Sequence, residues 1–206
     1  MGWAGLQGFF DDRFVRNYDR CVAPLERSVF REARKRLLGR AAGLVLDLGA
    51  GTGANAEYFE APVLSVIAID RDERMLVQSK ARPSAAVPIH MAVADAEALP
   101  FSSGVFDTVV ACLVLCTTPR PDIALAELVR VLAPGGRALF LEHVRSTSAI
   151  IGMAQDLANP VNRLVAGGCN LNRRTESSIR RAGLRVESRR SWFAGILVEI
   201  GAISTV

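Results

Sequence analysis

The sequence predicts an α/β fold built on an open, doubly wound sheet. Short runs rich in Val, Ile and Leu alternate with helical stretches through most of the chain, and one of these runs leads directly into a glycine-rich turn. Two further extended runs follow each other closely at the end of the chain. Alternating strands and helices are typical of a parallel sheet with helices on both faces, so we expect that architecture here.

A helical region is predicted ahead of the first strand. From Leu25 to Leu38, apolar residues recur every fourth position, which is the period of one helix face. Basic residues cluster on the same stretch, and we expect them on its solvated face. These residues are Arg27, Arg31, Arg34, Lys35, Arg36 and Arg40. Residues 1–40 are therefore expected to form an N-terminal helical lid on the domain.

Five strands are predicted in the central part of the chain, each apolar on both faces, as strands in a buried parallel sheet must be. They are Leu44–Leu48, Leu64–Ile69, Ile89–Ala94, Thr108–Leu115 and Ala138–Glu142. The helical stretches between them are Ala54–Phe59, Glu73–Lys80 and Ile123–Leu132. Pro121 favours the start of the last helix, and the Pro134-Gly135-Gly136 sequence favours its end.

The end of the chain has a different pattern. A helix near Glu176–Ala182 precedes two extended runs, Leu184–Ser191 and Ile196–Ile203. Strands joined by so short a connection pair antiparallel. The prediction is a seven-stranded sheet with a C-terminal antiparallel strand pair, and the 206 residues suit a single domain, residues 1–206.

Composition excludes several classes of protein. Hydrophobic residues make up 50% of the chain and the net charge is only +4, which excludes general disorder. No apolar run approaches the ~18 residues that span a bilayer, which leaves peripheral contact as the expected form of any membrane association. The four cysteines show no framework of a small secreted domain, so we expect reduced thiols and a cytoplasmic protein. Because Cys112-x-x-x-Cys116 has no second close pair, we expect no metal site.

The sharpest local signal is the glycine-rich turn after the first strand. Gly49, Gly51 and Gly53 allow a sharp turn and a close approach of a ligand to the backbone. Asp70 ends the second strand, twenty-one residues after Gly49. A carboxylate at that position can bind both hydroxyls of a ribose, so the pair predicts an adenosine-containing cofactor.

Two cofactors compete for this turn. The spacing Gly49-x-Gly51-x-x-Ala54 is compatible with a dinucleotide. However, Asp47 directly before the turn would repel a pyrophosphate, whereas it could hold an ammonium group. The third glycine also comes one residue early, and the chain leaves little room for a substrate domain. These features favour S-adenosylmethionine, which has no phosphate and ends in an amino-acid group.

Several segments together resemble class I S-adenosylmethionine-dependent methyltransferases, which have a Rossmann-like fold. The segments are Leu46-Asp-Leu-Gly-Ala-Gly-Thr-Gly53, Asp70, Ala94-Asp-Ala-Glu-Ala-Leu-Pro-Phe101, Phe106-Asp-Thr-Val-Val110 and Leu132-Ala-Pro-Gly-Gly136. The resemblance implies that Asp47, Gly49, Ala50 and Gly51 face the methionine part of the cofactor, with Cys112 and Leu113 beside it. It also implies that Asp70 binds the ribose, Arg71 and Met75 flank the adenine, Asp95 and Ala96 bind the adenine edge, and Tyr18 belongs to a lid.

A narrower resemblance concerns the methyl acceptor. The segments Val109-Val-Ala-Cys-Leu-Val-Leu-Cys116, Glu142-His-Val144 and Gly168-Cys-Asn-Leu-Asn-Arg173 are similar to vertebrate methyltransferase-like proteins that S-methylate alkyl thiols. Those proteins have a hydrophobic N-terminal anchor, which this sequence does not show. Bacterial relatives of the same pattern methylate quinones, lipids and natural products. S-methylation of a thiol or dithiol is the first expectation, and O- or C-methylation of a quinone, phenol, lipid or natural product stays open.

Histidine is the natural candidate for acid–base chemistry, and the chain has only two. His143 directly follows the fifth predicted strand, at the carboxyl edge where open α/β sheets bind ligands. We expect it to act at the acceptor as a base or an orienting group, with a structural role at the strand end as the alternative. His90 begins the third strand, at the opposite edge.

Apolar residues at helical spacing are expected to cover the acceptor. Phe10, Phe14 and Tyr18 follow this spacing near the N-terminus, where core packing is the alternative. The insert of residues 144–175 has a second such series and also contains Cys169, a candidate pocket residue. An apolar cover favours a small hydrophobic substrate over a nucleic acid. Two other classes stay open, a nucleic-acid-modifying enzyme and a non-catalytic cofactor-binding protein.

Overall fold

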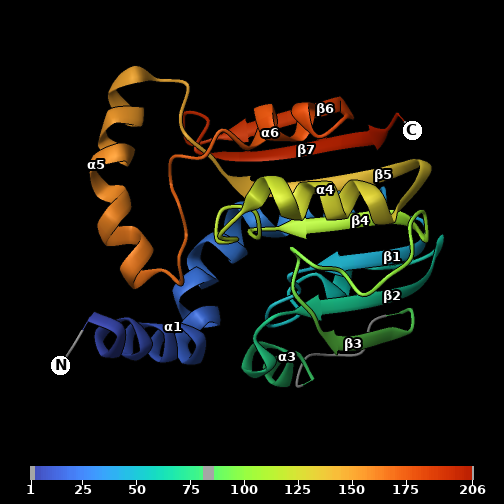
Figure 1. The fold of residues 1–206 in the computed structure, drawn as a ribbon, viewed down its shortest axis with the longest axis horizontal. Helices are drawn as coiled ribbons and strands as arrows, with labels where there is room; N and C mark the ends of the chain where they lie inside the picture. Colours follow the sequence, from blue (N-terminus) through green and yellow to red (C-terminus); the bar gives the residue numbers. More distant parts are fainter. Residues whose placement is uncertain (1–2, 81–85, 206) are drawn as a thin grey trace.

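The computed structural model describes residues 3–80 and 86–205, and its centre is a seven-stranded sheet in the order β3-β2-β1-β4-β5-β7-β6 (Figure 1). Strands β1 to β5 run parallel, and β7 pairs antiparallel with both β5 and β6. The predicted fold class is therefore confirmed. The strands are β1 Gly43–Leu48, β2 Val63–Asp70, β3 Ile89–Val93, β4 Phe106–Cys112, β5 Leu132–His143, β6 Leu184–Trp192 and β7 Leu197–Ser204.

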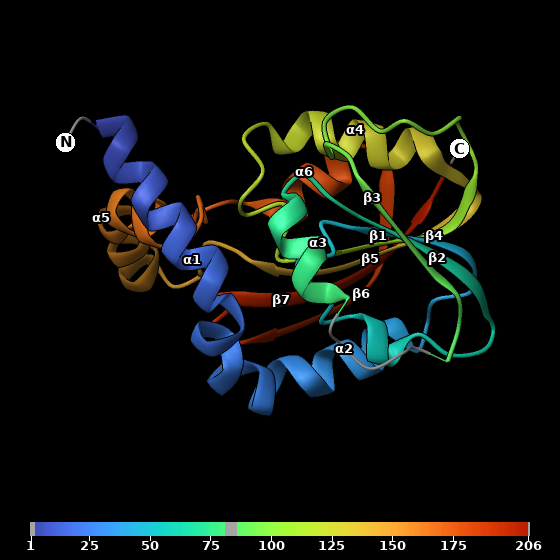
Figure 2. The same ribbon diagram turned by 90° about the horizontal axis from the view of Figure 1, so that it is seen from below.

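Helices cover both faces of the sheet (Figure 2). They are α1 Trp3–Leu25, α2 Arg31–Leu38, α3 Glu73–Ser79, α4 Pro121–Val131, α5 Ala149–Val165 and α6 Thr175–Arg181, and a π-helical turn, Glu26–Phe30, joins α1 to α2. Successive strand residues point to opposite faces, so neighbours such as Val109 and Val110 contribute to two different hydrophobic clusters. One cluster packs against α4 and α6, and the other against α2.

Two elements are shorter in the structure than the sequence predicts. The expected helix at Ala54–Phe59 is only a single 3₁₀ turn, Ala56–Tyr58, because the glycine turn continues to Asn55 and Phe59 is drawn into the core, 1% exposed. The expected strand Thr108–Leu115 leaves the sheet after Cys112. There Leu113 adopts a φ of 61° and donates its N–H to the carbonyl of Leu141 at 2.7 Å. A positive φ is strained for leucine, and such strain is often found at functional sites.

The expectation that the basic residues of the N-terminal helix face solvent is wrong for Arg34. This side chain is only 4% exposed, pairs with Glu26 at 3.1 Å and lies 6.0 Å from the centre of the Phe30 ring. Arg36 also turns inward to Glu199 on β7. The reason is that α2 packs directly on the sheet, so Arg34 and Arg36 lie close enough to bind the buried side chains of Asn55 and Glu199.

Helix α5 stands apart from the sheet and contacts α1 (Figures 1 and 2). Both helices lie beyond the edge at which the parallel strands end (Figure 1). Among the described residues, we find no helix with the length and apolar character needed to cross a membrane.

Candidate functional site

The glycine turn after β1 forms the floor of the site. A Cβ atom on Gly49 would lie 2.5 Å from Cγ2 of Val114, in the loop that follows β4, so only glycine fits at this position. Gly51 differs, because a Cβ there would meet only the carbonyl of Gly49 at 3.9 Å. The space above Gly51 is therefore open, and a ligand can approach the backbone there. Ala50 is buried and donates its N–H to the carbonyl of Ile69 on β2 at 2.8 Å.

Asp70 at the end of β2 is held in place by two backbone groups. Its Oδ2 accepts the N–H of Gly51 at 2.9 Å, and its Oδ1 accepts the N–H of Asp72 at 2.9 Å. Burial raises the pKa of Asp70, which these two hydrogen bonds partly offset. Each carboxylate oxygen has a second acceptor position, so a diol can bind to both oxygens at once.

Asp47 at the end of β1 is only 2% exposed. Its Oδ1 accepts a hydrogen bond from Nδ2 of Asn55 at 2.7 Å, and Oδ1 of Asn55 accepts one from Arg34. Burial raises the pKa of Asp47 to about 7, while Asn55 and Arg34 act in the opposite direction. Sequence reasoning missed Asn55 and Arg34, because a buried polar chain between a loop and a neighbouring helix leaves no local pattern.

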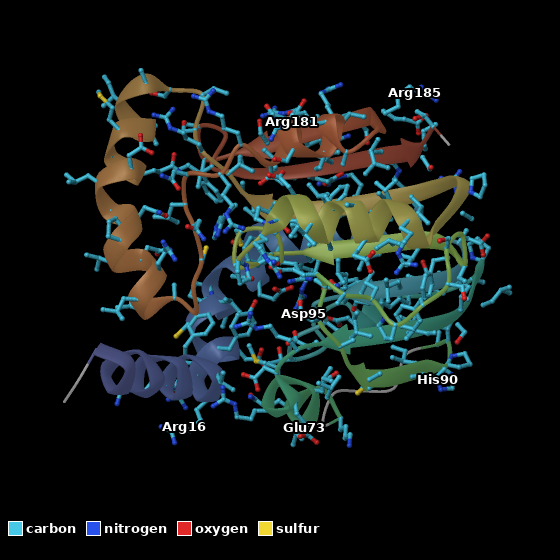
Figure 3. All side chains as sticks on the ribbon, in the orientation of Figure 1. Arg16, Glu73, His90, Asp95, Arg181 and Arg185 are labelled. Carbon is cyan, nitrogen blue, oxygen red and sulfur yellow. The ribbon has the colours of Figure 1, made fainter. Side chains whose placement is uncertain are left out.

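The residues expected around an adenine lie at the next strand ends. Ala94 donates its N–H to the carbonyl of Asp70 at 3.1 Å, which brings the segment after β3 beside the end of β2. Asp95 is exposed at the carboxyl edge of the sheet, whereas His90 lies toward the opposite edge (Figure 3). Ala96 and Met75 are half-buried, and Arg71 is exposed.

Together these groups suit an adenosine with an amino-acid tail. Asp70 offers paired oxygens for a ribose diol, and exposed Asp95 offers a carboxylate for an exocyclic amine. The open space above Gly51 leaves room for a ligand bound at Asp70 to extend along the glycine turn. The chemistry of this donor set fits S-adenosylmethionine.

The loop after β4 turns over this edge because Glu142 holds it. Glu142 is fully buried, and its carboxylate accepts backbone N–H groups of Val114, Leu115 and Cys116 at 2.8–3.1 Å. Burial raises its pKa to about 7, and these hydrogen bonds oppose that rise. Local sequence patterns do not predict this anchor, because its partners lie in the loop after another strand, more than twenty residues away. Cys112, just before the loop, is buried, and burial raises its pKa to about 12.

Three residues that are distant in sequence meet beyond this loop. Sγ of Cys169 lies 3.7 Å from Nδ1 of His143, and Cys116 completes a group whose ligand atoms lie within 4.8 Å of one another. The hydrogen bond with Cys116, and after it the contact with His143, lowers the pKa of Cys169 below that of a free thiol, whereas the same hydrogen bond raises the pKa of Cys116. Burial lowers the pKa of His143, but Cys169 outweighs it and raises the pKa overall. His143 is half-buried, so part of its side chain remains accessible to solvent.

The C-terminal half of α1 packs beside this cluster. Phe14 and Tyr18 form an edge-to-face pair with ring centres 5.3 Å apart. A Cβ on Gly167 would lie 2.5 Å from the Phe14 ring, so this ring rests directly on the loop that leads to Cys169. Burial raises the pKa of Tyr18 to about 12, with Arg34 acting in the opposite direction. The side chain of Phe10 lies outside the described part of the structure.

Helix α5 reaches the site through polar rather than apolar contacts. Gln155 is 6% exposed, accepts the N–H of Ser146 and donates to the carbonyls of Val144 and Leu171. The expectation that the apolar series of the insert faces the acceptor is not met, because these amide contacts turn that series outward. Five of its members, Ile150, Met153, Leu157, Val161 and Val165, are 46–85% exposed, and only Ile151 and Leu164 are half-buried.

Comparisons with known proteins agree with this geometry. The family model described as "Methyltransferase domain" matches residues 46–140. The human thiol S-methyltransferase TMT1A is 32% identical over 180 residues, which cover 84% of this chain and 73% of that protein. The ubiquinone/menaquinone biosynthesis C-methyltransferase UbiE of Pseudomonas putida is 37% identical over 123 residues, 57% of this chain and 48% of that protein. The chain thus spans only about half of the length of this second relative.

Solved structures are similar in fold. One chain of the complex between the Haloferax volcanii Trm112 methyltransferase activator and a methyltransferase has a TM-score of 0.74 and 16% identity, covering 96% of this chain and 98% of that one. An S-adenosylmethionine-dependent methyltransferase of Thermotoga maritima has a TM-score of 0.69 and 20% identity, covering 96% and 99%. At these identities the likeness concerns the fold alone.

Proposed function

The chain belongs to the class I S-adenosylmethionine-dependent methyltransferases, and from this membership we propose that it methylates the sulfur of a thiol on a small hydrophobic molecule. The observation that carries the proposal is the position of His143. It ends β5 at the carboxyl edge, where its ring lies beside Cys116 of the loop after β4 and 3.7 Å from Sγ of Cys169. The similarity to thiol S-methyltransferases over most of the chain supports the same acceptor.

S-adenosylmethionine, when bound, supplies an electrophilic methyl group on a sulfonium. The acceptor thiol must lose its proton, and its sulfur then forms a bond to the methyl carbon while the carbon–sulfonium bond breaks. An in-line transfer of this kind depends on alignment and on the exclusion of water. The protein's task is therefore to hold both reactants and to favour the thiolate.

We assign the cofactor contacts from the resemblance to the family. Asp70 binds the ribose and Asp47 lies near the amino-acid end. The remaining proposed cofactor contacts are Tyr18, Gly49, Ala50, Gly51, Arg71, Met75, Asp95, Ala96, Cys112 and Leu113.

The acceptor side is assigned to a smaller group. His143 promotes ionisation of the acceptor thiol, whose pKa is ordinarily near ~8.5. Phe14 and Cys169 line the acceptor pocket, and Phe10 is assigned to the same lid. Residues 1–40 and the insert 144–175 act as the two covers of a single methyltransferase domain.

A second acceptor class has a specific observation in its favour. The identity to a quinone C-methyltransferase is 37%, higher than to the thiol enzyme, although it extends over fewer residues. Nucleic acid is a weaker candidate, because two arginines of the basic α2 segment, Arg34 and Arg36, are engaged by Glu26 and Glu199. Salt-dependent binding of RNA or DNA would favour it.

The proposal is tested with methyl-labelled S-adenosylmethionine and a panel of acceptors. The panel contains alkyl thiols and dithiols of increasing chain length, with the matching alcohols and amines as controls, together with phenols and quinols. We expect label to transfer to hydrophobic thiols and not to their alcohol counterparts. Transfer to quinol carbon or phenol oxygen with no thiol methylated would contradict the thiol acceptor.

A further inference from the structure

Three side chains with metal-binding atoms converge beside the acceptor edge. Cys116 follows β4, His143 ends β5 and Cys169 lies in the loop after α5. One ligand atom from each lies within 4.8 Å of the other two. We propose that these residues bind a zinc ion whose fourth position is open to water or to the acceptor thiol.

The spacing of the ligand atoms suits zinc. Zn–S bonds of about 2.3 Å and Zn–N bonds of about 2.0–2.1 Å in a tetrahedron place a sulfur and a nitrogen about 3.6 Å apart. Sγ of Cys169 and Nδ1 of His143 are 3.7 Å apart. Two thiolates and an imidazole are preferred zinc donors, and three protein ligands with an open fourth position are typical of catalytic rather than structural zinc.

The two cysteines are held by a surrounding set of hydrogen bonds. The N–H of Cys116 binds Glu142 at 3.1 Å, and its carbonyl accepts the N–H of Asn170 at 2.8 Å. The carbonyl of Cys169 accepts Nδ2 of Asn162 at 2.7 Å. Partners of this kind orient metal ligands and hold them ready for the ion.

The charges of the cluster also suit a divalent cation. Cys116 is 1% exposed and Cys169 is 8% exposed, and buried thiolates are costly without a counter-charge. Two thiolates balance the charge of one zinc ion. The other charged groups of the cluster are the Glu142 carboxylate and the Arg173 guanidinium, which binds the carbonyl of Leu115. Their charges are opposite, so the metal-bound cluster is close to neutral.

This inference rests on the proposed function for its chemistry and extends it. A thiol that coordinates a metal loses its proton outright. An acceptor thiol in the fourth position would therefore bind as a thiolate at neutral pH, which an alcohol would not do as readily. His143 then promotes ionisation of the acceptor through the metal that it helps to bind.

The site is tested by metal binding to the full chain, without reference to activity. The protein is reduced with a phosphine, loaded with Zn²⁺ and freed of excess metal. Its zinc content per chain is then measured by elemental mass spectrometry. Co²⁺ serves as the spectroscopic probe. We expect one zinc ion per chain, and thiolate-to-cobalt charge-transfer and tetrahedral ligand-field bands with Co²⁺. Cys116→Ser and Cys169→Ser should each weaken binding by more than the roughly 10–100-fold that loss of an outer-shell partner costs.

Matched controls make the test decisive. Cys21→Ser, at an exposed cysteine, and His90→Gln, at the opposite edge, should bind zinc like the wild type. Wild-type protein that retains no more zinc than the Cys116→Ser/Cys169→Ser double variant would overturn the site, provided that circular dichroism and binding of S-adenosylhomocysteine show both to be folded.

The two proposals fail in different ways. Zinc bound through the three residues, with no thiol methylated, would support the metal site and overturn the thiol acceptor. Full thiol methylation by chelator-treated, zinc-free protein would leave the thiol acceptor standing and overturn the role of the metal at it.

Discussion

The backbone N–H of Gly51 donates a 2.9 Å hydrogen bond to Oδ2 of Asp70, so the glycine turn after β1 and the carboxylate that ends β2 form one unit. The glycine positions the carboxylate, and the carboxylate fixes the turn. Since the N–H of Asp72 binds the other oxygen, Oδ1, both carboxylate oxygens are held in place before any ligand arrives. Pre-organisation of this kind reduces the cost of binding a ribose.

The first prediction concerns this carboxylate. Asp70→Ala removes the proposed partner of both ribose hydroxyls and should weaken binding of S-adenosylhomocysteine by about 1.5–3 kcal/mol, the cost of losing hydrogen bonds to a charged group. Isothermal titration calorimetry measures the effect. Asp122→Ala, at an exposed position on α4, is the control and should bind like the wild type. Unchanged affinity of the Asp70 variant would remove it from the site.

The second prediction concerns the buried arginine that the sequence placed on the surface. Arg34→Met leaves Oδ1 of Asn55 and the Glu26 carboxylate without their donor. Breaking a buried pair from one side costs about 3–5 kcal/mol, and we expect the lower end because Glu26 is partly exposed. Urea unfolding gives the free energy. Arg31→Met, at an exposed position one turn away, should change it by less than about 0.5 kcal/mol. Equal losses in the two variants would show that Arg34 contributes no more than a surface residue.

The third prediction is a pH dependence of stability. The folded-state pKa of Asp47 is raised to about 7, above the value in the unfolded chain, so the folded state binds the extra proton between these values. The stability contributed by this group is full at low pH and is lost as the pH rises toward 7, with a slope of up to about 1.4 kcal/mol per pH unit. In Asp47→Asn this dependence is absent. Urea unfolding at pH 5 and pH 8 should therefore show a larger decline for the wild type than for the variant. If the free energies of unfolding of the wild type and the variant differ by the same amount at pH 5 and at pH 8, the proposed linkage to Asp47 is ruled out.

The sequence predicted the features that depend on residues close together in the chain, and it did not predict those that depend on residues far apart. The strands of the parallel sheet, the antiparallel end and the pairing of Gly51 with Asp70 all follow from local periodicity or a short motif. The roles of Glu142 and Arg34 could not be predicted that way, since each depends on a partner in a distant segment, the loop after β4 for Glu142 and Asn55 in the turn after β1 for Arg34. Cys116, His143 and Cys169 lie 27 and 26 residues apart, so only the fold reveals that they meet. Helix α5 misled the prediction because most of its apolar side chains are exposed, while its buried Gln155 binds the rest of the protein.

The fourth prediction concerns the two covers. Residues 3–18 and 144–175 include parts of α1 and all of α5, which contact each other beyond the carboxyl edge of the parallel strands, and α5 has an exposed apolar face. We expect amide hydrogen exchange in both segments to slow when S-adenosylhomocysteine binds, because a methyl transfer site must exclude water. The buried strands β1 and β4 serve as the reference, since they should be protected with and without ligand. If the exchange rates in both segments are the same with and without the ligand, these segments are ordinary packing elements and not covers of the site.

The last prediction concerns the pH profile of the reaction, and it depends on the thiol acceptor. Whether His143 takes the proton itself or binds a metal that lowers the acceptor's pKa, its contribution is to supply a thiolate below the thiol's own pKa. His143→Ala should then lower kcat/KM most at pH 6–7, by about 10²–10⁴-fold. The deficit should shrink as the pH approaches and passes ~8.5, because the free thiol then ionises without help. His90→Ala is the matched control, and S-adenosylhomocysteine affinity checks that the cofactor site is intact. A deficit of the same size at every pH would show that His143 only positions the acceptor, since an orienting role does not depend on the acceptor's proton.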